Sequence, residues 1–190
     1  MKRRIAHVLK VSEQRADSWV ERDCMATFAL EKIGSGTERL AIGLPRSATM
    51  TFRCLAEVMT EPFFVLYVLH TPRGEGEPGR YQSEEISKTQ LDKFLERFER
   101  YLAGDARHDV WVRSVSNGDL IVWDRHNNIF AYGDLPRFVK RLSELGFKDQ
   151  EPPKLGVHQH YYRQELDSEA ADLLSVFDWH RTPLLAEDAQ

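Results

Sequence analysis

Two histidines separated by one residue, His158 and His160, are the residues best suited to metal chemistry in this sequence. Residues two apart on a β-strand point to the same face, so both imidazoles can reach one ion if the segment is a strand. Asp124, His126 or Asp167 could complete such a site. The spacing specifies none of these three, and a pair of surface histidines fits the same pattern. The motif therefore leaves two interpretations open: a site for a divalent metal such as zinc, or a pair of surface histidines without a ligand.

A second candidate site lies around a predicted hairpin. Asp124 and His126 follow one of its strands, and an aspartate can orient a histidine for general acid–base catalysis. The catalytic candidates are therefore Asp124 and His126. The residues expected to share a polar pocket with them are Asp105, His108, Asp109 and Arg113. The alternative is that these are turn residues, because aspartate readily satisfies its own backbone in tight turns.

Three glycines within residues 74–79 match the spacing GxGxxG, which is typical of dinucleotide-binding loops. Glu75 and Glu77, however, place carboxylates where a pyrophosphate would lie. The helix that follows this loop is not expected to begin until about residue 88, so no helix N-terminus can face the phosphates. We therefore expect no nucleotide here and interpret residues 72–86 as a mobile loop.

Composition indicates a soluble, globular and weakly acidic protein. The 190 residues carry a formal net charge of −4, and 42% of them are hydrophobic. This charge argues against binding to nucleic acid or to anionic membranes, and the longest apolar run, residues 63–69, is too short to span a bilayer. Cys24 and Cys54 form no CxxC pair and no disulfide framework. A cytoplasmic location follows as the expectation, and the oligomeric state stays open.

Hydrophobic patterning predicts a single α+β domain over residues 1–190, with helices packed on a mainly antiparallel sheet. The expected strands cover residues 25–33, 38–44, 63–69, 110–115, 120–124, 129–132 and 157–162. The expected helices cover residues 3–20, 48–60 with Ser47 as N-cap, 88–102 with Ser87 and Gln90 as a capping box, 135–145 capped by Asp134, and 168–177 capped by Asp167. Residues 180–190 are expected to form a flexible acidic tail.

The strands at about 110–132 should form a three-stranded meander that begins with a tight hairpin. Asn117–Gly118 suits a two-residue turn, which needs positive φ at both positions. That turn would place Trp111 opposite Asp124. One face of the hairpin would then be apolar, whereas the other would combine Trp111, Arg113 and Asp124, a residue mixture that favours protein binding.

A meander followed by a capped helix, in a small acidic chain, resembles bacterial toxin-immunity domains over about residues 110–146. The resemblance implies a non-enzymatic module, without a cofactor, that binds a protein partner. This hypothesis is favoured, and Trp111, Arg113 and Asp124 are its expected binding residues. The alternative is a metal-dependent hydrolase that uses His158 and His160. Binding to one partner regardless of chelators would favour the first hypothesis, and stoichiometric metal would favour the second.

Overall fold

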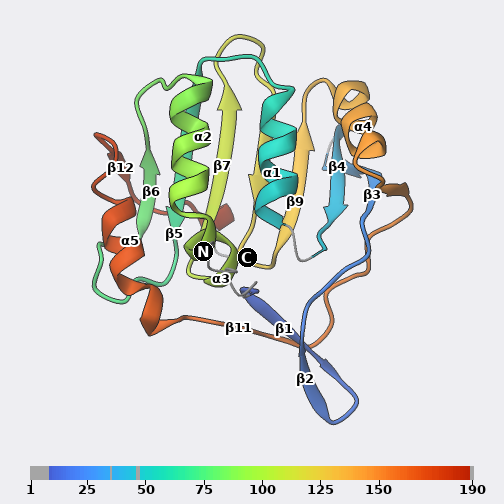
Figure 1. Ribbon diagram of the computed structural model, residues 1–190, viewed down its shortest axis with the longest axis horizontal. Coiled ribbons are helices and arrows are strands. Elements are labelled where there is room, and N and C mark those ends of the chain that lie inside the picture. Colours follow the sequence, from blue (N-terminus) through green and yellow to red (C-terminus); the bar gives the residue numbers. More distant parts are fainter. Residues whose placement is uncertain (1–8, 35, 46–47, 189–190) are drawn as a thin grey trace, which may run out of the picture.

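The computed structural model describes residues 9–34, 36–45 and 48–188. Within these ranges the chain forms a nine-stranded, mostly antiparallel sheet and a separate three-stranded sheet (Figure 1). The predicted α+β class is therefore confirmed. In the same ranges, no helix is both long and apolar enough to cross a membrane.

The strands of the large sheet are, in chain order, β3 (Thr27–Ile33), β4 (Thr37–Gly43), β5 (Phe63–Leu69), β6 (Gly79–Gln82), β7 (His108–Ser114), β8 (Leu120–Trp123), β9 (Asn128–Tyr132), β10 (Lys148–Asp149) and β12 (His180–Thr182). The small sheet contains β1 (Val11–Arg15), β2 (Ser18–Glu21) and β11 (His158–His160). The helices are α1 (Ala48–Glu57), α2 (Lys88–Arg97), α3 (Glu99–Gly104), α4 (Leu135–Glu144) and α5 (Asp167–Leu173), with short 3₁₀ helices η1 (Gln164–Leu166) and η2 (Ala186–Asp188).

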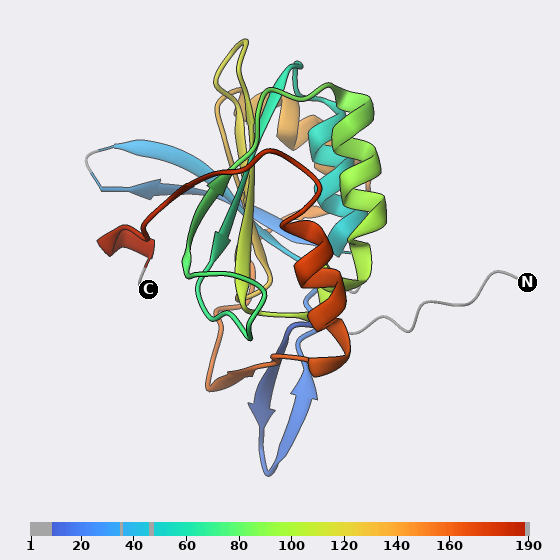
Figure 2. The same cartoon turned by 90° about the vertical axis from the view of Figure 1, so that its left-hand side faces the viewer.

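Strand order in the large sheet is β10-β3-β4-β9-β8-β7-β5-β6-β12, so the predicted meander β7-β8-β9 lies in its middle. Figure 2 shows α1, α2 and α5 on one face of this sheet, whereas η2 lies on the opposite face. We call the face that carries η2 the outer face. The helices thus form one layer, and the outer face is left for side chains that can meet a ligand.

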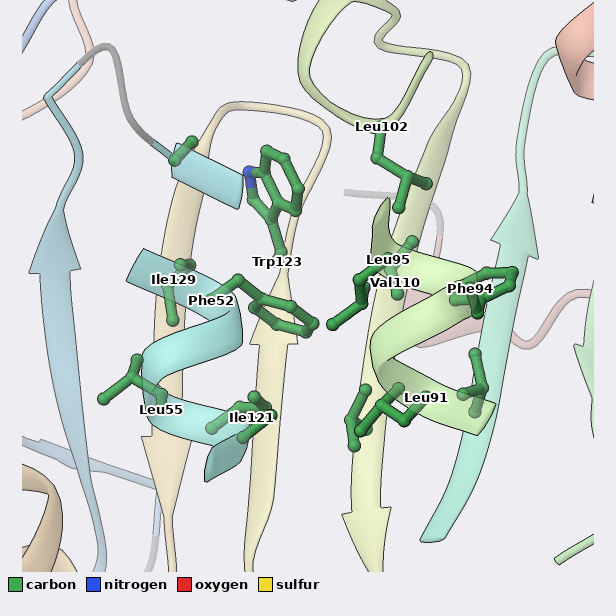
Figure 3. Close-up of a cluster of buried hydrophobic side chains, with 14 of the residues drawn as sticks. Phe52, Leu55, Leu91, Phe94, Leu95, Leu102, Val110, Ile121, Trp123 and Ile129 are labelled. Carbon is green, nitrogen blue, oxygen red and sulfur yellow. The ribbon is translucent and has the colours of Figure 1, made fainter. Parts of the chain in front are cut away.

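The core lies between the helical layer and the sheet. Phe52 of α1 packs beside Ile121 and Trp123 of β8, whereas Phe94 of α2 lies on the side of β7 and β5 (Figure 3), and all four side chains are buried. Trp123 is fully buried, and its Nε1 donates to the side chain of Asn127 at 3.0 Å. Apolar burial of this kind is worth about 25 cal/mol per Å², so the core stabilises the strands that form the outer face.

The hairpin β7–β8 exists, but its predicted turn is wrong. Trp111 pairs with Val122, two residues away from the predicted partner Asp124. Positive φ occurs at Gly118 (+78°) but not at Asn117, so this is not the two-residue turn expected. The cause is tertiary: the Asp119 carboxylate accepts a hydrogen bond from the backbone of Asp134 at 2.9 Å, which joins the loop to the start of α4. A shift of two residues keeps every side chain on its predicted face.

The N-terminal prediction of a helix over residues 3–20 is also wrong where the structure describes it. Residues 11–15 and 18–21 form the hairpin β1–β2, and residues 1–8 lie outside the described part. Strand β1 has β11 as its second neighbour. Pairing with a segment so distant in sequence leaves no local signal, and local periodicity cannot reveal it.

Two segments expected to be irregular contribute strands. Residues 79–82 of the predicted mobile loop form β6, which pairs with β5. Residues 180–182 of the predicted flexible tail form β12, which pairs with β6. Gly79 makes this edge pairing feasible, because a Cβ there would lie 2.8 Å from the carbonyl oxygen of Thr182. Residues 189–190 and the predicted N-cap Ser47 lie outside the described residues.

Candidate metal centre

Strand β11 presents His158 and His160 on the same side of the small sheet, as their spacing predicts. Its neighbour β1 fixes the register, with Val11 opposite His160 and Glu13 opposite His158. The backbone N–H of Tyr161 also donates to the carbonyl of Lys10 at 2.9 Å. Both histidines are therefore held by a defined strand and not by a loose loop.

The third histidine, His126, comes from the turn between β8 and β9. The Asp124 carboxylate accepts from the backbone N–H of Asn128 at 2.7 Å, which closes the turn. The buried Arg22 donates to the carbonyl oxygen of His126 at 2.8 Å and to the Asn128 side chain at 3.0 Å. His126 is thus positioned by the large sheet on one side and by a residue that follows β2 on the other.

These three histidines converge. Their candidate ligand atoms all lie within 4.8 Å of one another, and the ring centroids are 4.9 Å apart for His126–His160, 5.2 Å for His158–His160 and 5.4 Å for His126–His158. Among the described residues this is the one group of three or more histidine, cysteine or acidic side chains that satisfies this criterion. Tetrahedral zinc, with Zn–N bonds of 2.0–2.1 Å, requires nitrogens roughly 3.4 Å apart. Ligand atoms as far apart as 4.8 Å would have to move closer to reach that separation.

The second ring nitrogen of each histidine faces an oxygen atom. Nδ1 of His158 lies 2.9 Å from the carbonyl oxygen of Gly156, Nδ1 of His126 lies 3.5 Å from Oδ2 of Asp124, and Nδ1 of His160 lies 3.5 Å from the hydroxyl of Tyr162. Nε2 of His160 is buried, with no hydrogen-bond partner in the described part of the chain. Metal-binding histidines typically donate one N–H to such an oxygen and ligate through the other nitrogen. The arrangement therefore leaves Nε2 of each ring for an ion.

The charge states favour ligation. Burial, followed by the nearby positive charges of His126, His158 and Arg125, lowers the pKa of His160 to about 4, so this imidazole is neutral at pH 7. Burial alone would raise the pKa of Asp124, but hydrogen bonds from His126 and Asn128 outweigh it and hold that pKa below its ordinary value. An ionised Asp124 next to His126 increases the basicity of the imidazole.

The other residues expected near these histidines lie elsewhere. Asp167 is the first residue of α5 and not its N-cap, and its carboxylate accepts from Arg73 at 3.1 Å and from Arg107 at 2.9 Å. The predicted polar pocket of Asp105, His108, Asp109 and Arg113 is wrong as a unit. Asp105 is buried against Arg107, His108 is buried between two tyrosine rings, and Arg113 is exposed. Alternation along β7 puts His108 on the face opposite to Asp109 and Arg113, and Asp105 precedes the strand.

Asp109 has a role that the sequence did not reveal. Its Oδ2 lies 2.9 Å from Nε2 of His70, and its Oδ1 accepts from the backbone N–H of Arg125 at 2.7 Å. His70 directly follows β5, and it lines a pocket of about 430 Å³ together with His160. The structure therefore holds a second aspartate–histidine pair, His70–Asp109, in addition to the predicted pair Asp124–His126.

A second pocket, of about 230 Å³, lies on the outer face and reaches His126. It contains two of the three predicted binding residues, Trp111 and Asp124, although they are not paired across the strands. Arg113 is not among the residues that line it. Its walls are formed by Arg39, Asp109, Trp111, Leu120, Val122, Asp124, Arg125, His126, Phe130, Tyr132, Glu187 and Asp188.

A buried ion-pair network supports the chain that follows β11. Arg107 is fully buried, and it donates through Nε and Nη2 to the two carboxylate oxygens of Asp105 at 2.8 and 2.9 Å. The same carboxylate accepts from the backbone N–H of Arg163 at 2.7 Å. Asp105 thereby fixes the position of Arg163 and, through it, the end of the strand that carries His160.

Lys10, which directly precedes β1, is also fully buried. Its Nζ is 4.4 Å from the centroid of the Trp123 ring and donates to the carbonyl oxygen of Asp124 at 3.3 Å. Burial lowers the pKa of Lys10 from 10.5 to about 8, and nearby aspartates, Asp109 first, offset part of that effect.

This lowered pKa predicts a pH dependence of stability. Between pH 8 and 10.5 the unfolded chain retains the Lys10 proton that the folded chain has lost, so the folded state gains stability as pH rises. We expect the free energy of unfolding of the wild type, relative to Lys10→Met, to increase by about 1.4 kcal/mol per pH unit in this window. Urea unfolding at several pH values measures it. Parallel curves for the two proteins would show that Lys10 has an ordinary pKa.

Three imidazoles on two structural elements, with a carboxylate behind one of them, are equipped to bind a transition metal and leave a position free for a further ligand. Pockets adjoin the group at His126 and at His160. The chain matches no protein-family model, no curated protein and no solved structure, so these residues are the basis for any functional assignment.

Proposed function

We propose that this protein is a metal-dependent hydrolase whose His126, His158 and His160 bind one divalent ion, with zinc as the best fit. The convergence of the three histidines, with ligand atoms within 4.8 Å of one another, carries the proposal. A site with three histidine ligands keeps the fourth position of tetrahedral zinc open, which distinguishes catalytic from structural zinc sites. Bound zinc lowers the pKa of a coordinated water to about 7 and so supplies a nucleophile at neutral pH.

The surrounding residues suit hydrolysis. His126 would act as the ligand, and Asp124 would orient its imidazole. His70, oriented by Asp109, lines the pocket beside His160 and can transfer a proton to a leaving group there. Arg125 lines both pockets and can stabilise negative charge that develops on the substrate.

Hydrolysis of 4-nitrophenyl acetate by the full chain tests the proposal. We expect a rate above that of the buffer with one equivalent of zinc, loss of that rate after removal of zinc by a chelator, and recovery when zinc is restored. The control variant His180→Asn should behave like the wild type at each of these steps, because His180 is an exposed histidine on β12 and lies outside the cluster. Equal rates for the zinc-loaded and zinc-free proteins would contradict the proposal.

Asp124→Asn should weaken zinc binding about ten- to one-hundred-fold, because the loss of a charged partner lowers the basicity of a ligating imidazole. Isothermal titration with zinc measures the effect. Asp149→Asn, which removes an exposed aspartate of β10, should leave the affinity unchanged. Unchanged affinity in Asp124→Asn would show that this carboxylate does not support the ion.

Protein binding is a second proposal, and it has its own structural support. The hairpin β1–β2 projects from the body of the molecule (Figure 1), and Trp19 on it is 47% exposed. Exposed tryptophan and arginine are common anchors of protein interfaces. Co-purification of one stoichiometric partner that persists in chelator and is lost in Trp19→Asp would favour this function. Equal retention of the partner by that variant would count against it.

A further inference from the structure

The C-terminal turn, residues 184–188, lies between two pockets that both lead to the candidate metal centre. The 230 Å³ pocket reaches His126 and the 430 Å³ pocket reaches His160, and both are lined by Arg125 and Asp188. Figure 2 shows this segment on the outer face, away from the helices. Movement of Asp188 away from Arg125 would join the two pockets into one cleft. Typical ligand pockets measure roughly 300–1,000 Å³, which the joined cleft would match.

Asp188 is held by arginines. Its Oδ1 accepts from Nη1 of Arg80 at 2.7 Å, and its backbone carbonyl accepts from Nη1 of Arg125 at 3.3 Å. The other carboxylate oxygen accepts from the backbone N–H of Leu185 at 2.7 Å, which closes the turn on itself. The turn therefore places a buried carboxylate against Arg80 and a backbone carbonyl against Arg125, and Arg125 lines the pockets that reach the histidine cluster.

A third donor nearby has nothing to bind. Nε1 of Trp111 is buried and has no hydrogen-bond partner among the residues that the structure describes. The guanidinium of Arg80 lies 5.2 Å from the centroid of the Trp111 ring, so the two side chains are neighbours. Buried donors are nearly always paired, so this donor beside a pocket needs a partner that the described residues do not supply. An oxygen of a bound molecule would satisfy it.

We propose that Arg80, Arg125 and Trp111 form a carboxylate-binding subsite, and that Asp188 occupies it in place of the carboxylate of the substrate. The inference rests on the proposed function, because a molecule held there lies beside His126. Arginine binds carboxylates by directed, charge-assisted hydrogen bonds, and the turn displays that chemistry within the chain. Leu120, Val122 and Phe130 line the same pocket and suit an apolar body. The substrate class is thus a small carboxylic acid with an apolar group, and the turn competes with it.

Benzoate binding to the full chain tests this inference, with and without one equivalent of zinc. Asp188→Asn should bind benzoate at least about ten-fold more tightly than the wild type, because a competing internal occupant reduces the apparent affinity in proportion to the fraction of molecules that are open. Asp178→Asn, which removes an exposed aspartate outside both pockets, should match the wild type. Arg125→Gln added to Asp188→Asn should abolish the gain. A chain that ends after Pro183 removes the turn entirely and should show the same gain as Asp188→Asn.

Three results would overturn the inference: equal benzoate affinity in wild type and Asp188→Asn, a gain that survives Arg125→Gln, or an equal gain for the neutral analogue benzamide. If Asp188→Asn binds inorganic phosphate more tightly than the wild type does, but not benzoate, the assignment of a carboxylate as the ligand is overturned. The metal-free arm separates this inference from the proposed function. If neither the wild type nor Asp188→Asn binds zinc, but Asp188→Asn still binds benzoate more tightly than the wild type, the subsite stands and the metal centre fails.

Discussion

Replacement of His126 by alanine is expected to weaken zinc binding at least about one-hundred-fold. Structural zinc sites bind with apparent free energies of about 10–16 kcal/mol through four ligands, so one ligand contributes about 3 kcal/mol. Each 1.4 kcal/mol corresponds to a factor of about ten in affinity. The remaining pair, His158 and His160, has the two-residue spacing of any HxH motif, and it would bind zinc only weakly.

Competition with a chromophoric chelator measures this change, since it covers a wide range of affinities. His180→Ala is the control, because it removes an exposed histidine that the cluster does not use. The structure predicts a selective loss in His126→Ala. Equal affinities of His126→Ala and the wild type would show that the turn between β8 and β9 takes no part in binding.

Replacement of Asp105 by alanine should destabilise the fold by about 3–5 kcal/mol, the cost of leaving a buried charge without its partner. Asp105 and Arg107 are both fully buried, and two hydrogen bonds join their side chains. The variant also removes the acceptor for the backbone N–H of Arg163, so zinc affinity should fall as well. This loss of zinc affinity would occur although Asp105 is not a candidate ligand.

Urea unfolding of the two proteins measures the stability change, and zinc titration of the folded variant measures the second effect. Asp149→Ala serves as the control, because it removes an exposed aspartate. A loss of stability below about 1 kcal/mol would mean that Glu75 and Asp167, the other acidic partners of Arg107, suffice to hold it.

His158 and His160 could be placed on one face from sequence, because the period of a strand is two residues whatever its neighbours. The third histidine could only be named as one of several candidates. Its position depends on the β1–β11 pairing and on Arg22, which joins the end of the N-terminal hairpin to the turn around His126. Such contacts link segments that are far apart in the chain, and local pattern does not encode them.

The same limit explains the errors of register and pairing. The faces of β7 and β8 follow from alternation, but the length of their turn depends on the bond from Asp134 to Asp119. No motif in the sequence singles out His70, although it directly follows an apolar strand. Only the antiparallel pairing of β5 with β7, which puts Val68 opposite Asp109, brings His70 to its partner.

Zinc K-edge X-ray absorption of the full chain, loaded with one equivalent of zinc, tests the central claim most directly. The structure predicts three imidazole nitrogens at about 2.0–2.1 Å, with one further light atom. Absorption of free aqueous zinc would contradict the claim. A sulfur shell at about 2.3 Å would also contradict it, because Cys24 or Cys54 would then be the ligand instead of His126, His158 and His160.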